Sequence, residues 1–256
     1  MRNRKEMRIA AIVQAHMGST RLPGKVMKLI DNKPMLWHVL WRLRKSKFLD
    51  EVIVATTEKK ADQVIFKFAQ SLGLNVFAGS EENVLDRYYR TAKKYKIRIV
   101  VRVTSDCPLI DPWFVDKAIS TYLEQRESLD LVYNGKTFPV GCAAAEVFSF
   151  EILQRIWQEA KSPYEREHVT PYIYWNPQLF RIKAMEHEKD LSHLRLVVDH
   201  ENDLKLVKEI FYHLGSEKQL FHLKEIVRLL DYKPELLKIN RIEVEKYSLM
   251  EKSTGD

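Results

Sequence analysis

The chain has 256 residues, 45% of them hydrophobic and 30% charged, so it can bury a sizeable core as one large domain or one domain with a small appendage. Lys and Arg number 42 against 35 Asp and Glu, a net charge of +7 that favours an anionic partner and excludes an acidic, disordered chain. No stretch approaches the roughly 20 apolar residues of a membrane span, and the basic N-terminus lacks a signal-peptide cleavage site. The two cysteines, Cys107 and Cys142, are too few for a disulfide framework or a cysteine-based zinc site, so we expect a cytoplasmic protein.

The first half of the chain alternates short apolar runs with helical patterns. The apolar runs predict buried strands at residues 9–13, 52–55, 74–77 and 97–103. Apolar residues at helical spacing predict helices over residues 34–47, 64–72 and 83–95. This order predicts the α/β class, with a mixed, mostly parallel central sheet between layers of helices.

The second half is less regular. Helices are expected over residues 112–126, 151–160, 165–175 and 203–214. Strands are expected at residues 131–133, 146–150, 179–185 and 194–198. From residue 216 onward the pattern is helical only. We therefore expect a main domain over residues 7–215 and a C-terminal helical appendage over residues 216–256.

The loop after the first strand carries side chains suited to a polyphosphate. Gly18 and Gly24 permit close backbone approach, while Arg21 and Lys25 supply fixed positive charge. In open α/β sheets, ligands bind beyond the carboxyl ends of the strands, where this loop lies. The loop is no Walker A motif, because five residues separate its two glycines and Val26 stands where Ser or Thr would hold magnesium. A basic surface turn is the alternative interpretation.

Two aspartates follow predicted strands and could share one magnesium ion. Asp106 ends the fourth strand and Asp199 ends the run at residues 194–198. Magnesium takes one or two carboxylates together with substrate phosphates. The alternative for Asp199 is a capping role at the next helix, which Asn202 could also fill. Asp111, which precedes a proline, is interpreted as a helix N-cap, and Asp203 suits the dipole of a first helical turn.

These segments resemble the signature of sugar nucleotidylyltransferases, and more narrowly the cytidylyltransferase family of acylneuraminate and 3-deoxy-manno-octulosonate activating enzymes. Within it, the chain is most similar to the spore coat polysaccharide biosynthesis branch. The resemblance covers roughly residues 7–215, and its most specific parts are the first loop and the segment around Asp106. The matching segments are residues 14–25, 79–88, 102–110, 146–149, 166–172 and 196–199.

The resemblance implies a nucleotide-diphosphate-sugar transferase fold, of Rossmann-like three-layer α/β/α architecture, that binds CTP and Mg²⁺. Arg21 and Lys25 would contact the β- and γ-phosphates, and Asp106 and Asp199 would hold the metal. The residues expected to be catalytic are Arg21, Lys25 and Asp106. The expected nucleotide-binding residues are Gln14, Ala15, Gly18, Ser19, Arg21, Lys25, Ser80, Asn83, Arg87, Thr104 and Ser105.

The acceptor region is where the chain departs from the resemblance. Many branch members carry an acidic residue where this chain has Cys142, Ala143 and Ala144. Glu146 and His168 are the expected acceptor contacts, with a strand-edge salt bridge and a structural helix-start role as their alternatives. The acceptor is either an acidic sugar or a phosphorylated sugar or polyol, which would give a CMP- or CDP-linked product. A base other than cytosine stays an alternative.

The expected reaction is attack of an acceptor oxygen on the α-phosphorus of CTP, with release of pyrophosphate, for surface polysaccharide or glycan synthesis. Such transfer depends mainly on positioning and charge neutralisation. A glycosyltransferase of similar fold is one alternative, although the segment after Asp106 supplies no Asp-x-Asp metal motif. A non-catalytic basic binding protein is the other, but the basic run with Trp37 and Trp41 is more simply an amphipathic helix.

We expect no nucleic-acid or membrane partner. A homodimer is one interpretation of the aromatic residues Tyr172, Tyr174 and Trp175, and packing within the chain is the other.

Overall fold

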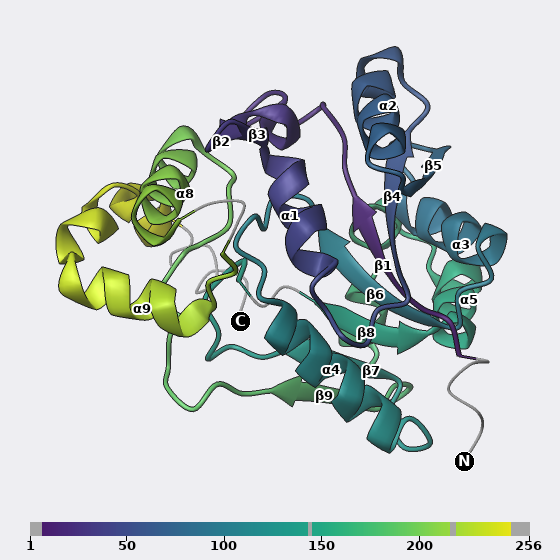
Figure 1. Cartoon of the computed structure of the whole chain (residues 1–256). Helices are drawn as coiled ribbons and strands as arrows, with labels where there is room; N and C mark the ends of the chain where they lie inside the picture. Colours follow the sequence, from purple (N-terminus) through teal and green to yellow (C-terminus); the bar gives the residue numbers. More distant parts are fainter. Residues whose placement is uncertain (1–6, 143–144, 216–218, 247–256) are drawn as a thin grey trace.

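Figure 1 shows the computed structural model of the chain, which describes residues 7–142, 145–215 and 219–246. One seven-stranded sheet lies between two layers of helices, and further helices at the C-terminal end pack beside it. The predicted α/β class and three-layer architecture are therefore confirmed. Within the described ranges, no helix combines the length and the apolar composition needed to cross a membrane.

The sheet is parallel except for one strand. Its order is β5-β4-β1-β6-β8-β7-β9, and β8 alone runs antiparallel to its neighbours. Apolar runs form the strands because both faces of a parallel sheet are covered by helices. The strands are β1 (Ile9–Gln14), β4 (Glu51–Thr57), β5 (Asn75–Gly79), β6 (Ile99–Thr104), β7 (Leu131–Asn134), β8 (Glu146–Ser149) and β9 (Ile182–Met185).

The two faces of the sheet bury different helices. Side chains alternate along β1, so Ala11 and Val13 lie in one hydrophobic cluster while Ala10 and Ile12 lie in the other. The first cluster includes residues of α1 (Met35–Leu43), α2 (Gln63–Ser71), α4 (Pro112–Gln125), α8 (Glu201–Leu214) and α9 (Leu223–Tyr232). The second includes residues of α3 (Val84–Lys94) and α5 (Phe150–Glu159), with α7 (Pro171–Trp175).

Several short elements complete the chain. A two-stranded hairpin, β2 (Leu29–Ile30) with β3 (Lys33–Pro34), was absent from the sequence expectation. Because Pro34 belongs to this hairpin, α1 begins one residue later than expected, and it ends at Leu43 instead of residue 47. The remaining elements are α6 (Pro163–His168) and the 3-10 turns η2 (Lys25–Met27), η3 (Lys60–Asp62) and η4 (Pro234–Lys238).

The expected strand at residues 194–198 is wrong. Leu194 O and Leu196 N bond Val140, but only an isolated bridge forms there, and Val198 N bonds Asp106 O. Arg195 is buried in this segment, and its side chain bonds the carboxylates of Asp203 and Asp199. Its apolar neighbours still enter the core, which explains why the apolar run resembled a strand.

The single helix expected over residues 165–175 is also wrong. Two short helices, α6 and α7, stand in its place. Val169 between them has a φ of 75°, in the left-handed region that a β-branched residue rarely adopts. Pro171 reinforces the break, because it has no N–H to continue the α6 hydrogen-bond pattern. The change of direction turns the C-terminal end of α6 toward the cleft described below.

The C-terminal helices share the core of the main domain. Phe221, Leu223 and Ile226 lie in the same hydrophobic cluster as β1. The buried guanidinium of Arg42 in α1 donates to the backbone oxygen of Phe221 at 2.7 Å. A division of the chain near residue 215 stays a prediction, while the described residues on both sides of it are packed together.

Candidate active site

The cleft lies where the strand order of the sheet reverses. From β1 the chain moves to β4 and β5 on one side, then returns to place β6 on the other side of β1. The loops that follow β1 and β6 therefore separate at the carboxyl edge of the sheet, and such switch points are where ligands bind in open α/β folds. Both predicted site segments leave these two strands.

Hydrogen bonds within the loop after β1, and from the loop to Asp62, hold its backbone in place. Gly24 has a φ of 66°, and its N–H donates to Met17 O at 3.1 Å, which closes the loop. The N–H of Met17 donates to the carboxylate of Asp62 at 2.6 Å, and Thr57 donates to the same carboxylate. Because Asp62 is buried, this anchor fixes the loop backbone and directs Lys25 into the cleft.

Lys25 joins the two aspartates that the sequence singled out. Its ammonium lies 2.9 Å from the carboxylate of Asp106, 2.9 Å from that of Asp199, and 2.9 Å from Val198 O. Burial opposes the charge on Lys25, but the two carboxylates outweigh it and raise the pKa of the ammonium above its usual value. Residues 25, 106 and 199, far apart in the chain, thus form one polar cluster.

Two guanidinium groups complete the cluster around Asp199. Arg21 and Arg195 each lie 2.8 Å from its carboxylate, on different oxygens, and Arg195 also pairs with Asp203 at 3.2 Å. Arg21 is largely exposed, whereas the Arg195 side chain is only 6% exposed. Burial acts against the charge on Asp199, yet Lys25, Arg21 and Arg195 outweigh it and lower its pKa to about 2. Both carboxylates of the predicted metal site are thus paired with cations of the protein.

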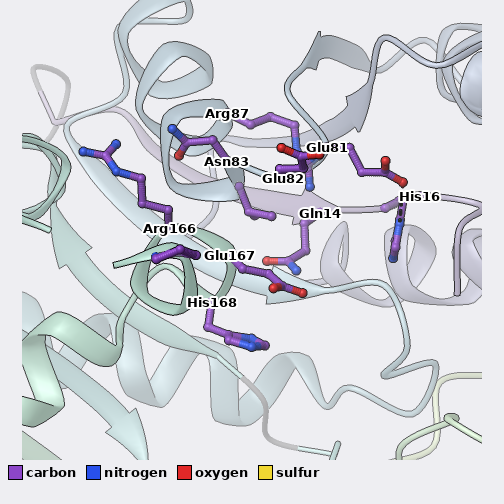
Figure 2. A pocket seen from close by; sticks show the side chains of 12 residues that line it. Gln14, His16, Glu81, Glu82, Asn83, Arg87, Arg166, Glu167 and His168 are labelled. Atoms are coloured by element: carbon purple, nitrogen blue, oxygen red, sulfur yellow. Dashed lines mark ion pairs between the residues drawn. The ribbon is translucent and has the colours of Figure 1, made fainter. Parts of the chain in front are cut away.

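Two adjoining pockets occupy the carboxyl edge of the sheet. The smaller, of about 330 Å³, lies over the Lys25 cluster, and its lining includes Gly18, Ser19, Thr104 and Ser105, whose role as nucleotide contacts stays a prediction. The larger, of about 670 Å³, includes residues of α3 and α6 (Figure 2). The residues that line both are Gln14, His16 and Glu167.

Some of the predicted nucleoside contacts line the larger pocket, and others hydrogen-bond to the residues that line it. Ala15, Asn83 and Arg87 line the larger pocket, and Arg87 is buried with its guanidinium donating to Ser80 O at 2.8 Å. Burial lowers the pKa of Arg87 below its usual value. Asn83 caps α3 by accepting from the N–H of Asp86. Ser80 is not among the residues that line either pocket, and its hydroxyl accepts from Asn83 N at 3.0 Å.

The two predicted acceptor contacts differ in availability. Glu146 lines neither pocket, and its carboxylate is bound by Arg102 at 2.5 Å, Thr170 at 2.9 Å and Tyr174 at 2.6 Å. Its position matches the salt-bridge alternative. His168 does line the larger pocket, with its ring 4.2 Å from that of Tyr164.

Only part of the segment that departs from the family pattern lies among the described residues. Cys142 is buried, and its thiol donates to Leu109 O. Burial raises its pKa well above the usual range. Ala143 and Ala144 lie outside the described residues.

The donor set at Asp106 and Asp199 fits a magnesium ion. Two carboxylates face one point, and magnesium completes such a site with substrate phosphate oxygens and water. The ammonium of Lys25 lies between them and marks that point as one that stabilises positive charge. Among the described residues, no group of three or more His, Cys, Asp or Glu side chains is arranged to hold a metal.

Three residues in or beside the cleft were not identified as functional from the sequence. Asp62 anchors the first loop, Arg195 orients Asp199, and Glu167 lines both pockets. Arg195 had a signal, since it is a lone charge inside an apolar run, and buried charges need partners. Asp62, which is buried in η3, and Glu167 in α6 each lie among other charged residues of the sequence, so neither stood out from its neighbours.

The fold and this cluster of cations and carboxylates define a nucleotidyltransferase. The family model described as Cytidylyltransferase matches residues 10–245, so the chain belongs to the cytidylyltransferase family. The prediction of the family, and of an enzyme, is confirmed.

Similar proteins support this assignment. An uncharacterised protein of Methanocaldococcus jannaschii is 41% identical over 91% of this chain and 95% of its own. The spore coat polysaccharide biosynthesis protein SpsF of Bacillus subtilis is 32% identical over 89% and 95%. A 3-deoxy-manno-octulosonate cytidylyltransferase of Geotalea daltonii is 37% identical over 48% of each chain.

Solved structures show the same fold. A cytidylyltransferase from Leptospira borgpetersenii is 33% identical, with a TM-score of 0.86 over 90% of this chain and 96% of its own. A CMP:2-keto-3-deoxy-manno-octonic acid synthetase complexed with CTP is 20% identical, with a TM-score of 0.63 over 80% and 99%.

Proposed function

We propose that this cytidylyltransferase transfers CMP from CTP to a sugar acceptor, either an acidic sugar or a phosphorylated sugar or polyol, and releases pyrophosphate. The observation that carries the proposal is the meeting of Arg21 and Lys25 with Asp106 and Asp199 at one edge of the sheet. Cations there can hold phosphates, and carboxylates can hold the ion that accompanies them. The names of the relatives support a sugar acceptor.

In this proposal each residue has a separate task. Arg21 and Lys25 turn from the carboxylates to the β- and γ-phosphates and neutralise the leaving pyrophosphate. Asp106 and Asp199 hold Mg²⁺, which when bound stabilises negative charge at the α-phosphate. The larger pocket, with Asn83 and Arg87, receives the nucleoside. Glu167 and His168 lie on the opposite side of that cleft, where an acceptor can approach (Figure 2).

Pyrophosphate release tests this function. The protein with MgCl₂ is given each of the four nucleoside triphosphates with a panel of acidic sugars, phosphorylated sugars and phosphorylated polyols. We expect release with CTP and with one class of acceptor, and the mass of the product shows whether a CMP or CDP linkage forms. Release that needs a different triphosphate would overturn the cytidine assignment. No release with any triphosphate would favour a glycosyltransferase or a binding protein. A homodimer and a cytoplasmic location stay predictions.

A further inference from the structure

A chain of buried polar contacts runs from the C-terminal segment, residues 219–246, to the Asp199 carboxylate. It begins at Asn240, which is 1% exposed and lies just after η4. The side-chain amide of Asn240 donates to Arg195 O at 3.0 Å and to the carboxylate of Asp203 at 3.1 Å. Both hydrogens of that amide are therefore used, and both are directed to residues that adjoin Asp199.

Asp203 passes this constraint to the backbone around Asp199. Its carboxylate accepts from the N–H groups of Asp199 at 3.1 Å and His200 at 3.0 Å, at the start of α8. The Asp203 side chain is fully buried, so its orientation depends on the donors that surround it. From the sequence, only a favourable interaction of this aspartate with the helix dipole was expected. In the structure it also accepts hydrogen bonds from Arg195, Asn240 and two backbone N–H groups.

Arg195 passes the same constraint to the Asp199 side chain. Its Nε donates to Asp203 and its Nη2 donates to the Oδ2 atom of Asp199 at 2.8 Å. The other oxygen, Oδ1, faces Lys25 and Arg21 in the cleft. One carboxylate oxygen is thus held from within the protein, and the other is presented to the ligand side.

We propose that Asn240 is a positioning residue, through which the C-terminal segment orients Asp199 for the metal-bound nucleotide. The inference rests on the proposed function, because it assigns Asp199 to the metal. Groups that orient metal ligands commonly change metal affinity or activity by 10- to 100-fold when mutated. The C-terminal segment would therefore contribute to the reaction without touching substrate.

The chain provides a matched control for this proposal. Asn202 lies in α8, next to Asp203, and donates to Glu243 Oε1 at 3.0 Å. This is a second hydrogen bond between α8 and the C-terminal segment. Neither of these residues bonds Asp203, Arg195 or Asp199 through its side chain in the part of the chain that the structure describes. Asn240→Leu and Asn202→Leu each remove one such bond, but only the first interrupts the path to Asp199.

The measurement is the gain in CTP affinity that the metal provides. Isothermal titration gives the Kd of CTP in EDTA and in excess Mn²⁺ for the full-length protein, with no acceptor needed. We expect the ratio of the two constants to fall by about tenfold in Asn240→Leu and to remain at the wild-type value in Asn202→Leu. If Asn240→Leu does not fold, Asn240→Ser, which is too short to reach both acceptors, takes its place.

The outcomes separate this inference from the proposed function. A variant that loses thermal stability but keeps the wild-type ratio would show Asn240 to be merely structural and overturn the proposal. Equal losses in the Asn240 and Asn202 variants would overturn it as well. A wild-type ratio of one would overturn the metal role of Asp199 itself, and this inference with it. A wild-type ratio well above one with an unchanged Asn240 variant would overturn the inference alone.

Discussion

At the scale of single residues, the candidate site is a balanced set of charges, and under the proposed function a bound nucleotide would replace some of its ion pairs. Lys25, Arg21 and Arg195 face Asp106, Asp199 and Asp203. Three cations and three carboxylates leave no net charge, which lowers the cost of burying Lys25, Arg195 and Asp203, while Arg21 stays largely exposed. A triphosphate with its metal brings both signs of charge and so can exchange partners with this set.

Removing Lys25 tests that exchange. In Lys25→Met the two carboxylates lose their shared cation and the phosphates lose a donor, so we expect pyrophosphate release to fall by about 100-fold or more. Lys28→Met is the control, since Lys28 pairs with Glu201 at 3.6 Å on the exposed surface. The steady-state rate of pyrophosphate release is measured for both variants. A wild-type rate for Lys25→Met would contradict the assignment.

The pKa of Asp199 predicts an acid-dependent stability. Because its pKa of about 2 lies below the usual 3.8, the paired carboxylate stabilises the folded state above pH 4. That contribution, about 2 kcal/mol in full, is lost as pH falls through 2, with about 1 kcal/mol lost by pH 3. Urea unfolding at pH 6 and pH 3 measures it by comparison with Asp199→Asn. The free-energy gap between the two proteins should narrow at pH 3, and a constant gap would contradict the pairing.

At the scale of elements, helix caps and a break between two helices position the residues of the candidate site. Asp111 caps α4 by accepting from Trp113 N at 3.0 Å, as the sequence predicted. It also accepts from Leu223 N at 2.8 Å and contacts His222, which the sequence did not show. Similarly, the chain changes direction at Val169 after α6, and a partly buried hydrogen bond from Thr170 to Glu146 holds this turn.

Asp111→Ala therefore costs more than an ordinary cap. Loss of a cap costs about 1 kcal/mol, and leaving the buried N–H of Leu223 without a partner adds about 1–3 kcal/mol. Ser149→Ala is the matched control, because Ser149 caps α5 by accepting from Ile152 N and, among the described residues, its hydroxyl accepts from no backbone N–H outside that helix. Urea unfolding of both variants gives the comparison. Equal losses would show that the bond to the C-terminal segment contributes nothing.

At the scale of the whole molecule, the C-terminal segment is part of the core. Phe221, Ile226 and Leu230 are buried in the same hydrophobic cluster as β1 and α8. Burial of side chains of this size stabilises a fold by about 1.5–3 kcal/mol each, which together approaches the net stability of a typical domain. The segment also supplies Asn240, whose hydrogen bond to Asp203 is linked through Arg195 to Asp199.

A chain that ends at residue 215 tests this packing. We expect it to aggregate, or to lose its cooperative thermal transition, because the removed side chains leave an apolar surface on α8 and α1. Circular dichroism during heating, with sedimentation of the sample, provides the measurement. A soluble truncated protein with the wild-type transition would instead establish residues 7–215 as an independent domain.

The sequence by itself determined the sheet, its helical layers and the two segments that build the site. Local patterns were enough because buried strands need apolar runs, and because the loop with Arg21 and Lys25 and the segment with Asp106 each begin where a strand ends. Only the tertiary structure decided that Arg195 leaves the strand direction, that Val169 breaks a helix, and that Asn240 reaches Asp203. The physical reason is that buried charges find their partners across the fold, at separations of up to 179 residues, as between Arg42 and Phe221, that no local pattern records.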